Sequence, residues 1–181
     1  MTHRLPCFAP RRRFLAVLGF GWLAGLTALD APAAPPAPIA PIITSAATRF
    51  TNNGNGTVTD SVTGLIWLTN ANCFGLQTWT NALSSANGLA STNCGLNDGS
   101  TAGQWRLPNR NELQSLIDYT RGSPALPVDH PFTNTPGGDY WSSTSLAFDP
   151  TQAWIVSISL GGVSPSLKVN SGRVWPVRGG L

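Results

Sequence analysis

Charged residues are scarce in this 181-residue chain, at 10% of the sequence against the roughly 25% usual for globular proteins. A long coiled coil and a charged disordered tail both need many more ionisable side chains, so the composition excludes them. Histidine is scarcer still, with two in the chain and only His130 outside the first few residues. A Ser-His-Asp catalytic set is implausible with one histidine, and the sequence contains neither H-E-x-x-H nor a phosphate-binding loop. We therefore expect neither enzymatic activity nor a resident cofactor.

Glycine, proline and tryptophan are plentiful by contrast. The 19 glycines and 15 prolines predict a body rich in turns. The seven tryptophans indicate a real core, because aromatic side chains bury large apolar areas. The length suits one domain or two small ones.

Residues 1–33 have the order of a secretory signal. Arg4 and the run Arg11–Arg13 precede an uncharged apolar stretch at 14–29, which is short for a membrane span, and small residues follow it. Cleavage after Ala33 fits the A-x-A rule, and an uncleaved anchor is the alternative. The letters R-R-x-F-L are similar to a twin-arginine signal, although an ordinary secretory signal explains the basic start as well. We expect an exported protein in the periplasm, at the cell surface or in the medium.

Removal of the signal changes the charge of the protein. Eleven basic and eight acidic residues become seven of each, because four arginines and Asp30 leave with the signal. A formally neutral chain has no global positive field to draw it to nucleic acids or anionic membranes. We therefore expect no nucleic-acid partner, and no membrane span after signal removal.

Two cysteines remain once Cys7 is removed with the signal. An even pair in an exported chain, Cys73 and Cys94, predicts a disulfide that closes a loop of moderate length. The alternative is a pair of metal ligands. Two thiolates need further ligands, however, and His130 is the one histidine left.

A proline- and alanine-rich linker at 34–47 separates the signal from one predicted domain at 48–181. Such a stretch favours extended polyproline conformations and cannot form a core. Within the domain, apolar residues around a turn at 60–64 predict a β-hairpin. Apolar residues at helical spacing predict a helix over 79–90.

A second helix is predicted after Asn109, because this N-cap residue and Glu112 three residues later form a capping box. Trp105 and Leu107 alternate before it, which is typical of a strand that ends in the core, and Arg106 is expected to pair with Glu112 or Asp118. Short strands are predicted at 140–143, 153–160, 167–170 and 173–178. Two helices among many short strands and long loops give an α+β fold class.

Six segments follow one another along the chain in an order that is distinctive of a family. They are G-T-V-T-D-x-x-T-G-L-I-W (56–67), N-A-N-C-F-G (70–75), W-R-L-P-N-R-N-E-L-Q-S-L-I-D (105–118), H-P-F-T-N (130–134), Y-W-S-S-T (140–144) and V-W-P-V-R-G-G (174–180). Together they resemble the Lcl C-terminal-type domain, named after the C-terminal part of the Legionella collagen-like adhesin and long described as a domain of unknown function. The resemblance covers about residues 49–181.

The resemblance implies a C-type-lectin-like fold, related in outline to that of formylglycine-generating enzymes. It also implies adhesion, because the adhesin's domain binds sulfated glycosaminoglycan-type polysaccharides. This chain departs from the adhesin in lacking G-X-Y repeats before the domain. It departs from the enzymes in lacking a thiol pair near the C-terminus, since its cysteine pair lies in the first half.

The loops between residues 121 and 149 are the expected ligand surface, because loops on a rigid scaffold carry recognition. An aromatic ring beside amide and acid groups can stack on a sugar face and bind its hydroxyls. The candidates for that role are Asp129, His130, Asn134, Tyr140 and Trp141. Trp141 could equally belong to the core and His130 could cap a turn.

Two further candidate sites follow from residue type. Cations that could bind sulfate or carboxylate groups are Arg121, Lys168 and Arg173. An oxygen-rich run could hold calcium through Asn53, Asn55 and Asp60, although asparagine–glycine pairs are also ordinary turn formers.

The sequence thus predicts an exported, non-enzymatic module that binds a polysaccharide or surface glycan in adhesion. The alternative is a structural or protein-assembly module of the bacterial envelope that takes no small ligand.

Overall fold

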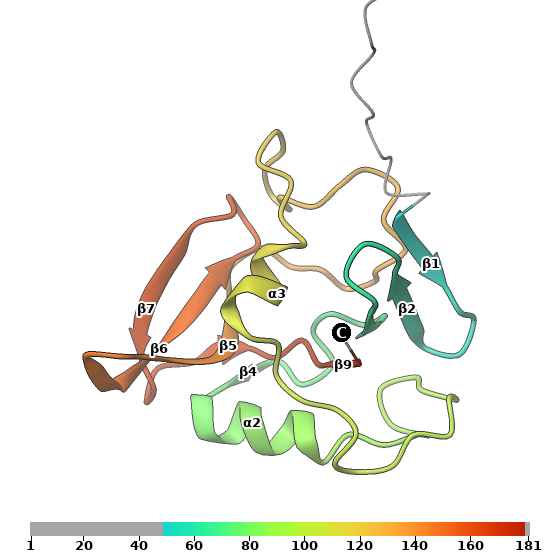
Figure 1. Ribbon diagram of the computed structural model, residues 1–181, viewed down its shortest axis with the longest axis horizontal. Coiled ribbons are helices and arrows are strands. Elements are labelled where there is room, and N and C mark those ends of the chain that lie inside the picture. The colour runs from blue at the N-terminus through green and yellow to red at the C-terminus, as the bar shows by residue number, and fades with distance from the viewer. Residues whose placement is uncertain (1–48, 180–181) are drawn as a thin grey trace, which may run out of the picture. The chain divides into compact units, whose positions relative to one another are not determined.

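The computed structural model describes residues 49–179, which fold into two helices and two β-sheets (Figure 1). The predicted export signal and the linker at 34–47 lie outside the described residues. The first sheet has the order β1-β2-β3-β9 and the second has the order β4-β8-β5-β6-β7. The predicted α+β class is therefore correct.

The first sheet is built on the predicted hairpin. Its strands are β1 (Phe50–Asn52), β2 (Thr57–Asp60), β3 (Leu65–Leu68) and β9 (Val177–Gly179), all paired antiparallel. Val58 lies opposite Trp67, and both side chains are fully buried. The C-terminal strand β9 completes this sheet beside β3, so residues more than 100 positions apart share it.

The second sheet contains the longest strands. It comprises β4 (Leu76–Gln77), β5 (Asp139–Leu146), β6 (Asp149–Ser157), β7 (Val163–Leu167) and β8 (Gly172–Arg173). Strands β5, β6 and β7 form an antiparallel meander, and β8 meets β5 in parallel. Helix α2 (Trp79–Asn87) packs Ala82 and Ala86 into a cluster with side chains of this sheet.

The predicted strands at the C-terminal end are partly wrong in their bounds. Strand β6 starts at Asp149, before the predicted 153, because Pro150 is tolerated at the beginning of a strand. Strand β7 covers 163–167 where 167–170 was predicted. Pro165 argues against a central strand, but β7 lies at the edge of the sheet, where proline is allowed.

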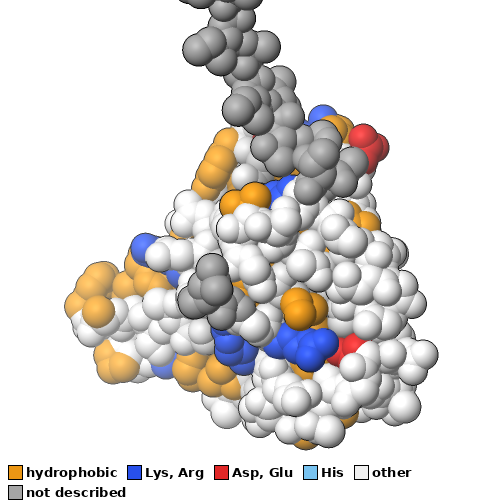
Figure 2. Space-filling model, turned by 45° about the vertical axis from the view of Figure 1, so that its right-hand side comes forward, with side chains coloured by type: hydrophobic (Ala, Val, Ile, Leu, Met, Phe, Trp, Pro, Cys, Tyr) orange, Lys and Arg blue, Asp and Glu red, His pale blue; other side chains and the backbone are white. Residues whose placement is uncertain are grey.

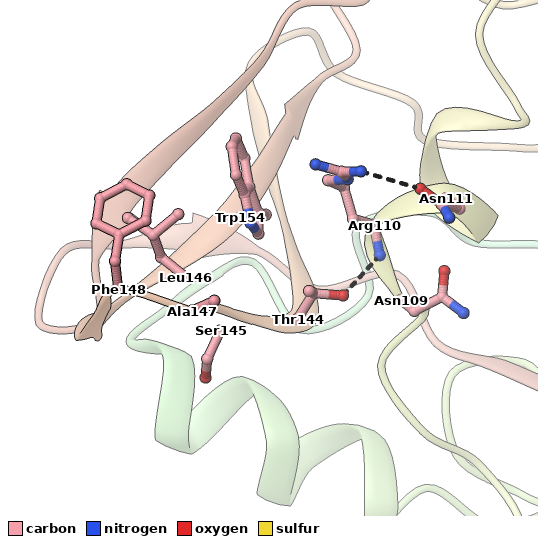
Figure 3. Close-up of a pocket in the computed structure, with 9 residues that line it drawn as sticks. All are labelled: Asn109, Arg110, Asn111, Thr144, Ser145, Leu146, Ala147, Phe148 and Trp154. Atoms are coloured by element: carbon pink, nitrogen blue, oxygen red, sulfur yellow. Dashed lines mark hydrogen bonds between the residues drawn. The ribbon is translucent and has the colours of Figure 1, made fainter.

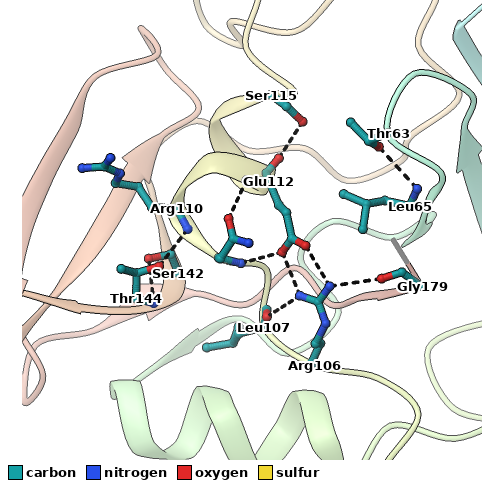
Figure 4. Close-up of polar contacts among 11 residues, drawn as sticks. Thr63, Leu65, Arg106, Leu107, Arg110, Glu112, Ser115, Ser142, Thr144 and Gly179 are labelled. Atoms are coloured by element: carbon teal, nitrogen blue, oxygen red, sulfur yellow. Dashed lines mark hydrogen bonds and ion pairs between the residues drawn. The ribbon is translucent and has the colours of Figure 1, made fainter. Parts of the chain in front are cut away.

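Helix α3 (Arg110–Gln114) begins as predicted. The Asn109 side chain accepts the Glu112 backbone N–H at 2.8 Å, and the Glu112 carboxylate accepts the Asn109 N–H at 2.7 Å. Glu112 also receives two hydrogen bonds from the Arg106 guanidinium, which confirms the first of the two expected partners. Figure 4 shows Arg106 reaching the Gly179 carbonyl oxygen as well, so one cation joins the start of α3 to the end of β9.

Four tryptophans lie in the core with no more than 1% of their surface exposed: Trp67, Trp105, Trp141 and Trp175. The Trp175 ring contacts those of Trp67, Phe132 and Tyr140 at centroid distances of 4.9 to 5.7 Å. Its Nε1 donates to the Leu68 carbonyl oxygen at 2.8 Å. The predicted aromatic core is therefore present, and Trp105 and Leu107 belong to it as expected.

Arg49 and Asp60 form an ion pair at the edge of the first sheet. Two guanidinium nitrogens lie 2.9 and 2.6 Å from the two oxygens of Asp60, whose side chain is fully buried. Burial alone would raise the pKa of Asp60, but hydrogen bonds from Arg49, Thr63 and the Val62 N–H outweigh it and hold that pKa below its usual value. The ionised carboxylate is thus part of the folded state.

We predict that Asp60→Asn lowers the free energy of unfolding by roughly 3 kcal/mol at pH 7, because it breaks a buried pair. A carboxyl with a lowered folded-state pKa stabilises the fold fully above its unfolded pKa of about 4, and that contribution is lost as the pH falls through the folded pKa. The difference in free energy of unfolding between the wild-type protein and Asp60→Asn, measured with denaturant, should therefore shrink below about pH 4. Asp139→Asn, at an exposed carboxylate, should change stability by less than about 0.5 kcal/mol. A pH-independent gap would contradict this account.

The structure contains the predicted disulfide between Cys73 and Cys94, which lie 21 positions apart. It ties the segment before β4 to the polar loop after α2, and that loop contacts the first sheet through the Asn97 N–H and the Asn55 carbonyl oxygen at 2.8 Å. Gly56 has no room for a side chain there, since a Cβ would clash with the Gly95 carbonyl oxygen.

Replacing both cysteines by serine should lower the free energy of unfolding by about 2–4 kcal/mol, because the unfolded chain is then no longer constrained. Unfolding with and without reductant, of protein produced in an oxidising compartment, measures this. Reductant should destabilise the wild-type protein and leave the double variant unchanged. Free thiols at both positions, detected by mass spectrometry without reduction, would show that the bond does not form there.

Candidate functional site

The two aromatic residues expected to meet a ligand do not lie on the surface. Tyr140 is fully buried and Trp141 is 1% exposed. The Trp141 Nε1 donates to the Gln77 carbonyl oxygen at 2.8 Å, and its ring packs against Gly172. The Tyr140 hydroxyl donates to the Pro136 carbonyl oxygen, and burial raises its pKa to about 12. The expectation that these rings stack on a sugar is wrong, because both side chains serve the core.

The three cations of the expected patch lie in different surroundings. Lys168 is held by the Ser145 hydroxyl at 2.8 Å and lies 3.9 Å from the centre of the Trp79 ring. Arg173 is half-buried on β8 with its guanidinium against Gly138, whereas Arg121 lines a pocket beside His130. Figure 2 likewise shows lysine and arginine in small groups rather than one basic surface on the face it displays.

Three of the predicted ligand residues do come together. Arg121, Asp129 and His130 line a pocket of about 330 Å³, which we call the His130 pocket; its other walls are Gly122, Ser123, Pro124, Leu126, Pro127 and Val128. Burial lowers the pKa of His130, so the imidazole is neutral at pH 7. Asn134 is not among the residues that line this pocket, and its side-chain amide donates to the Asn70 side chain at 3.0 Å.

The predicted calcium ligands are not assembled. Asn53 and Asn55 lie in the turn before β2, where their side chains bond to Thr57 and Thr59. Asp60 lies at the other end of β2, and its two oxygens are taken by Arg49 and Thr63. Within residues 49–179, no group of three or more acidic, cysteine or histidine side chains is placed to hold a metal ion. The three candidate calcium ligands are therefore not brought together in the fold.

A second pocket was not predicted from the sequence. It measures about 350 Å³ and lies between the start of α3 and the turn that joins β5 to β6 (Figure 3). We call it the Arg110 pocket; its walls are Asn109, Arg110, Asn111, Thr144, Ser145, Leu146, Ala147, Phe148 and Trp154.

The cation of this pocket is positioned by stacking. The Arg110 guanidinium lies 4.9 Å from the centre of the Trp154 ring. The backbone N–H of Arg110 donates to the Thr144 hydroxyl at 3.0 Å. Its side chain makes one long hydrogen bond, 3.5 Å, to Asn111. No carboxylate pairs with Arg110 in the described part of the chain. Most of its N–H donors are thus free for a ligand.

The apolar side of the pocket is unusually open to solvent. Phe148 is 86% exposed at the turn between β5 and β6, and Figure 3 shows its ring on the same side of the sheet as Trp154 and Arg110. Strand β5 is irregular just before this turn, with register shifts around Ser145. Successive residues of a strand point to opposite faces, so Thr144 reaches Arg110 while Ser145 reaches Lys168 on the other side. The pocket therefore offers a cation, amides and two aromatic rings.

One sequence signal could have pointed to this site. An exposed Phe148 is followed at once by Asp149-Pro150, a turn-forming pair, so an apolar ring at a hairpin turn could have been expected. Nothing in the sequence indicated that Arg110 would meet Trp154, because the two are 44 positions apart and belong to different elements.

Among residues 49–179 no helix is long and apolar enough to cross a membrane. A comparison with curated proteins found no match. The Lcl C-terminal domain family matches residues 56–178, about two thirds of the chain. The six segments that carried the resemblance form the hairpin, the disulfide segment, the α3 cap, the loop that contains Phe132, and strands β5 and β9. The chain therefore belongs to the Lcl C-terminal domain family.

Proposed function

We propose that this protein is an exported, non-enzymatic binding module and that its Arg110 pocket binds an acidic polysaccharide or surface glycan in adhesion. Membership of a family named after an adhesin, together with the disulfide, supports an extracellular location. The proposal includes the signal at 1–33, the linker at 34–47 and a C-type-lectin-like fold for the domain at 48–181. The α+β architecture with two helices is compatible with that fold.

The observation that carries the proposal is the pairing of a free cation with aromatic rings. Sugar rings present apolar C–H faces that stack on aromatic side chains, and their acidic groups pair with guanidinium. The Arg110 pocket offers both, since Arg110 has no acidic partner among residues 49–179 and Phe148 and Trp154 border it. The Asn109 and Asn111 amides provide hydrogen-bonding groups for hydroxyls at the same site.

The His130 pocket is the weaker candidate for such a ligand. It contains no tryptophan, phenylalanine or tyrosine, and proline and aliphatic side chains make up much of its wall. Its one cation, Arg121, shares the pocket with the carboxylate of Asp129, which would repel an acidic sugar.

We predict that exported protein binds acidic glycans on an array, and that Arg110→Gln weakens the binding by about tenfold or more, because hydrogen bonds to charged groups are worth about 1.5–3 kcal/mol. Phe148→Ala should weaken it about fivefold through lost stacking. The matched controls are Arg121→Gln in the other pocket and Val169→Ala, another exposed apolar residue. Titration calorimetry with an array-positive oligosaccharide gives the fold-changes.

Chelator should leave the binding unchanged, because Asp60 is committed to Arg49. If the control variants lose as much glycan affinity as the Arg110 and Phe148 variants, the site lies elsewhere. If folded protein gives no signal on the array, the alternative of a structural or protein-assembly module is favoured. Trp141→Ala is not a useful probe of the site, since it removes a core side chain.

A further inference from the structure

The face around the His130 pocket carries large apolar side chains that the proposed glycan site does not use. Leu160 is 75% exposed, Tyr119 is 64% exposed and Val128 is 48% exposed. They are close neighbours of the pocket. A Cβ placed on Gly122, a wall residue, would lie 3.4 Å from a Leu160 methyl, and one on Gly161 would lie 3.0 Å from the Tyr119 ring. Exposed apolar side chains grouped at a pocket mark an interaction surface.

This surface is rigidly built. The turn that carries Leu160 joins β6 to β7, and its backbone is fixed to the loop after α3. The Ser159 carbonyl oxygen accepts the Ser123 N–H at 2.6 Å, and the Ile158 carbonyl oxygen accepts the Ala125 N–H at 2.7 Å. Leu160 is therefore held out into solvent by a fixed turn, and little conformational freedom would be lost on binding.

Two features of this face are complementary to each other. Leu160 protrudes at the rim of a hollow of about 330 Å³ whose walls include Leu126, Pro124 and Val128. Arg121 and Asp129 both border that hollow, and neither forms an ion pair within residues 49–179. A protrusion beside a hollow, with opposite charges on one rim, suits a two-fold contact, in which residue i of one copy meets residue j of the other and residue j meets residue i.

We propose that this face pairs with the same face of a second copy of the chain. Leu160 of one copy enters the His130 pocket of the other, and Arg121 of each copy faces Asp129 of its mate. The seven basic and seven acidic residues outside the predicted signal leave no net charge to oppose the approach of two copies.

Pairing through the sheet edge is the competing route to a dimer, and Pro165 disfavours it. Ser157 and Lys168 donate across the β6–β7 ladder to Gly162 and Thr151, so the paired positions on β7 are the even-numbered ones. The odd-numbered residues, Pro165 among them, direct their backbone groups to the free edge. Proline has no N–H to offer there, which interrupts any added strand.

The test is sedimentation velocity of exported protein over a range of concentration. We expect a dimer at roughly 10–100 μM, the range of a modest self-association. Leu160→Asp should weaken dimerisation at least about tenfold, whereas Val169→Asp, at an equally exposed residue beyond the other end of β7, should leave it unchanged. Circular dichroism and thermal unfolding report whether each variant is folded.

A pair of charge variants separates direct contact from indirect effects. Arg121→Glu places a carboxylate opposite Asp129 of the other copy and should weaken the dimer. Adding Asp129→Asn removes that repulsion and should restore part of the affinity; asparagine also suits the positive φ of 61° at this position. A monomer at every concentration would overturn the proposal, as would a dimer indifferent to Leu160→Asp or an Arg121→Glu defect that Asp129→Asn does not relieve.

Discussion

The burial of Trp175 is the constraint on which the rest of the domain depends. Within residues 174–176 the chain leaves β8 in the second sheet and enters β9 in the first. The Trp175 indole donates to the Leu68 carbonyl oxygen and packs on rings from β3, β5 and the loop that contains Phe132. One side chain therefore fixes both sheets and a long loop. The position of β9 in turn sets the location of Arg178, whose carboxylate partner is Asp98 at 2.9 Å.

Much of the scaffold could be predicted because it obeys local rules. The α3 capping box needs residues three positions apart, and the hairpin needs a turn between two apolar runs. The sites could not be predicted in this way. Trp141 was expected on a ligand surface because it lies in a loop-rich region, yet it belongs to the long strand β5, where Tyr140, Trp141 and Ser142 are all buried. The Arg110 pocket depends on contacts between α3 and β6, and spacing along the chain does not reveal these.

The few charges of the chain divide between two roles. Six of the fourteen outside the predicted signal form the ion pairs Arg49–Asp60, Arg106–Glu112 and Asp98–Arg178, which join strands and loops. The family segments contain many of these groups, since W-R-L-P, N-R-N-E and V-W-P-V-R each contribute a partner or a cap. Of the four cations not used in this way, Arg110 and Arg121 border the two pockets, whereas Lys168 and Arg173 lie elsewhere on the second sheet and its turns.

Strand β6 separates the two pockets. The Arg110 pocket includes the turn at its beginning, and the loop that forms the His130 pocket is bonded to the turn at its end (Figure 1). A strand of nine residues spans about 27 Å at 3.4 Å per step. Pairing of two copies at the far end of β6 would therefore leave both Arg110 pockets open. Two sites on one particle raise the avidity for a repeating polysaccharide without any new contact. In the proposed dimer, the self-associating face thus makes the protein bivalent for such a polysaccharide.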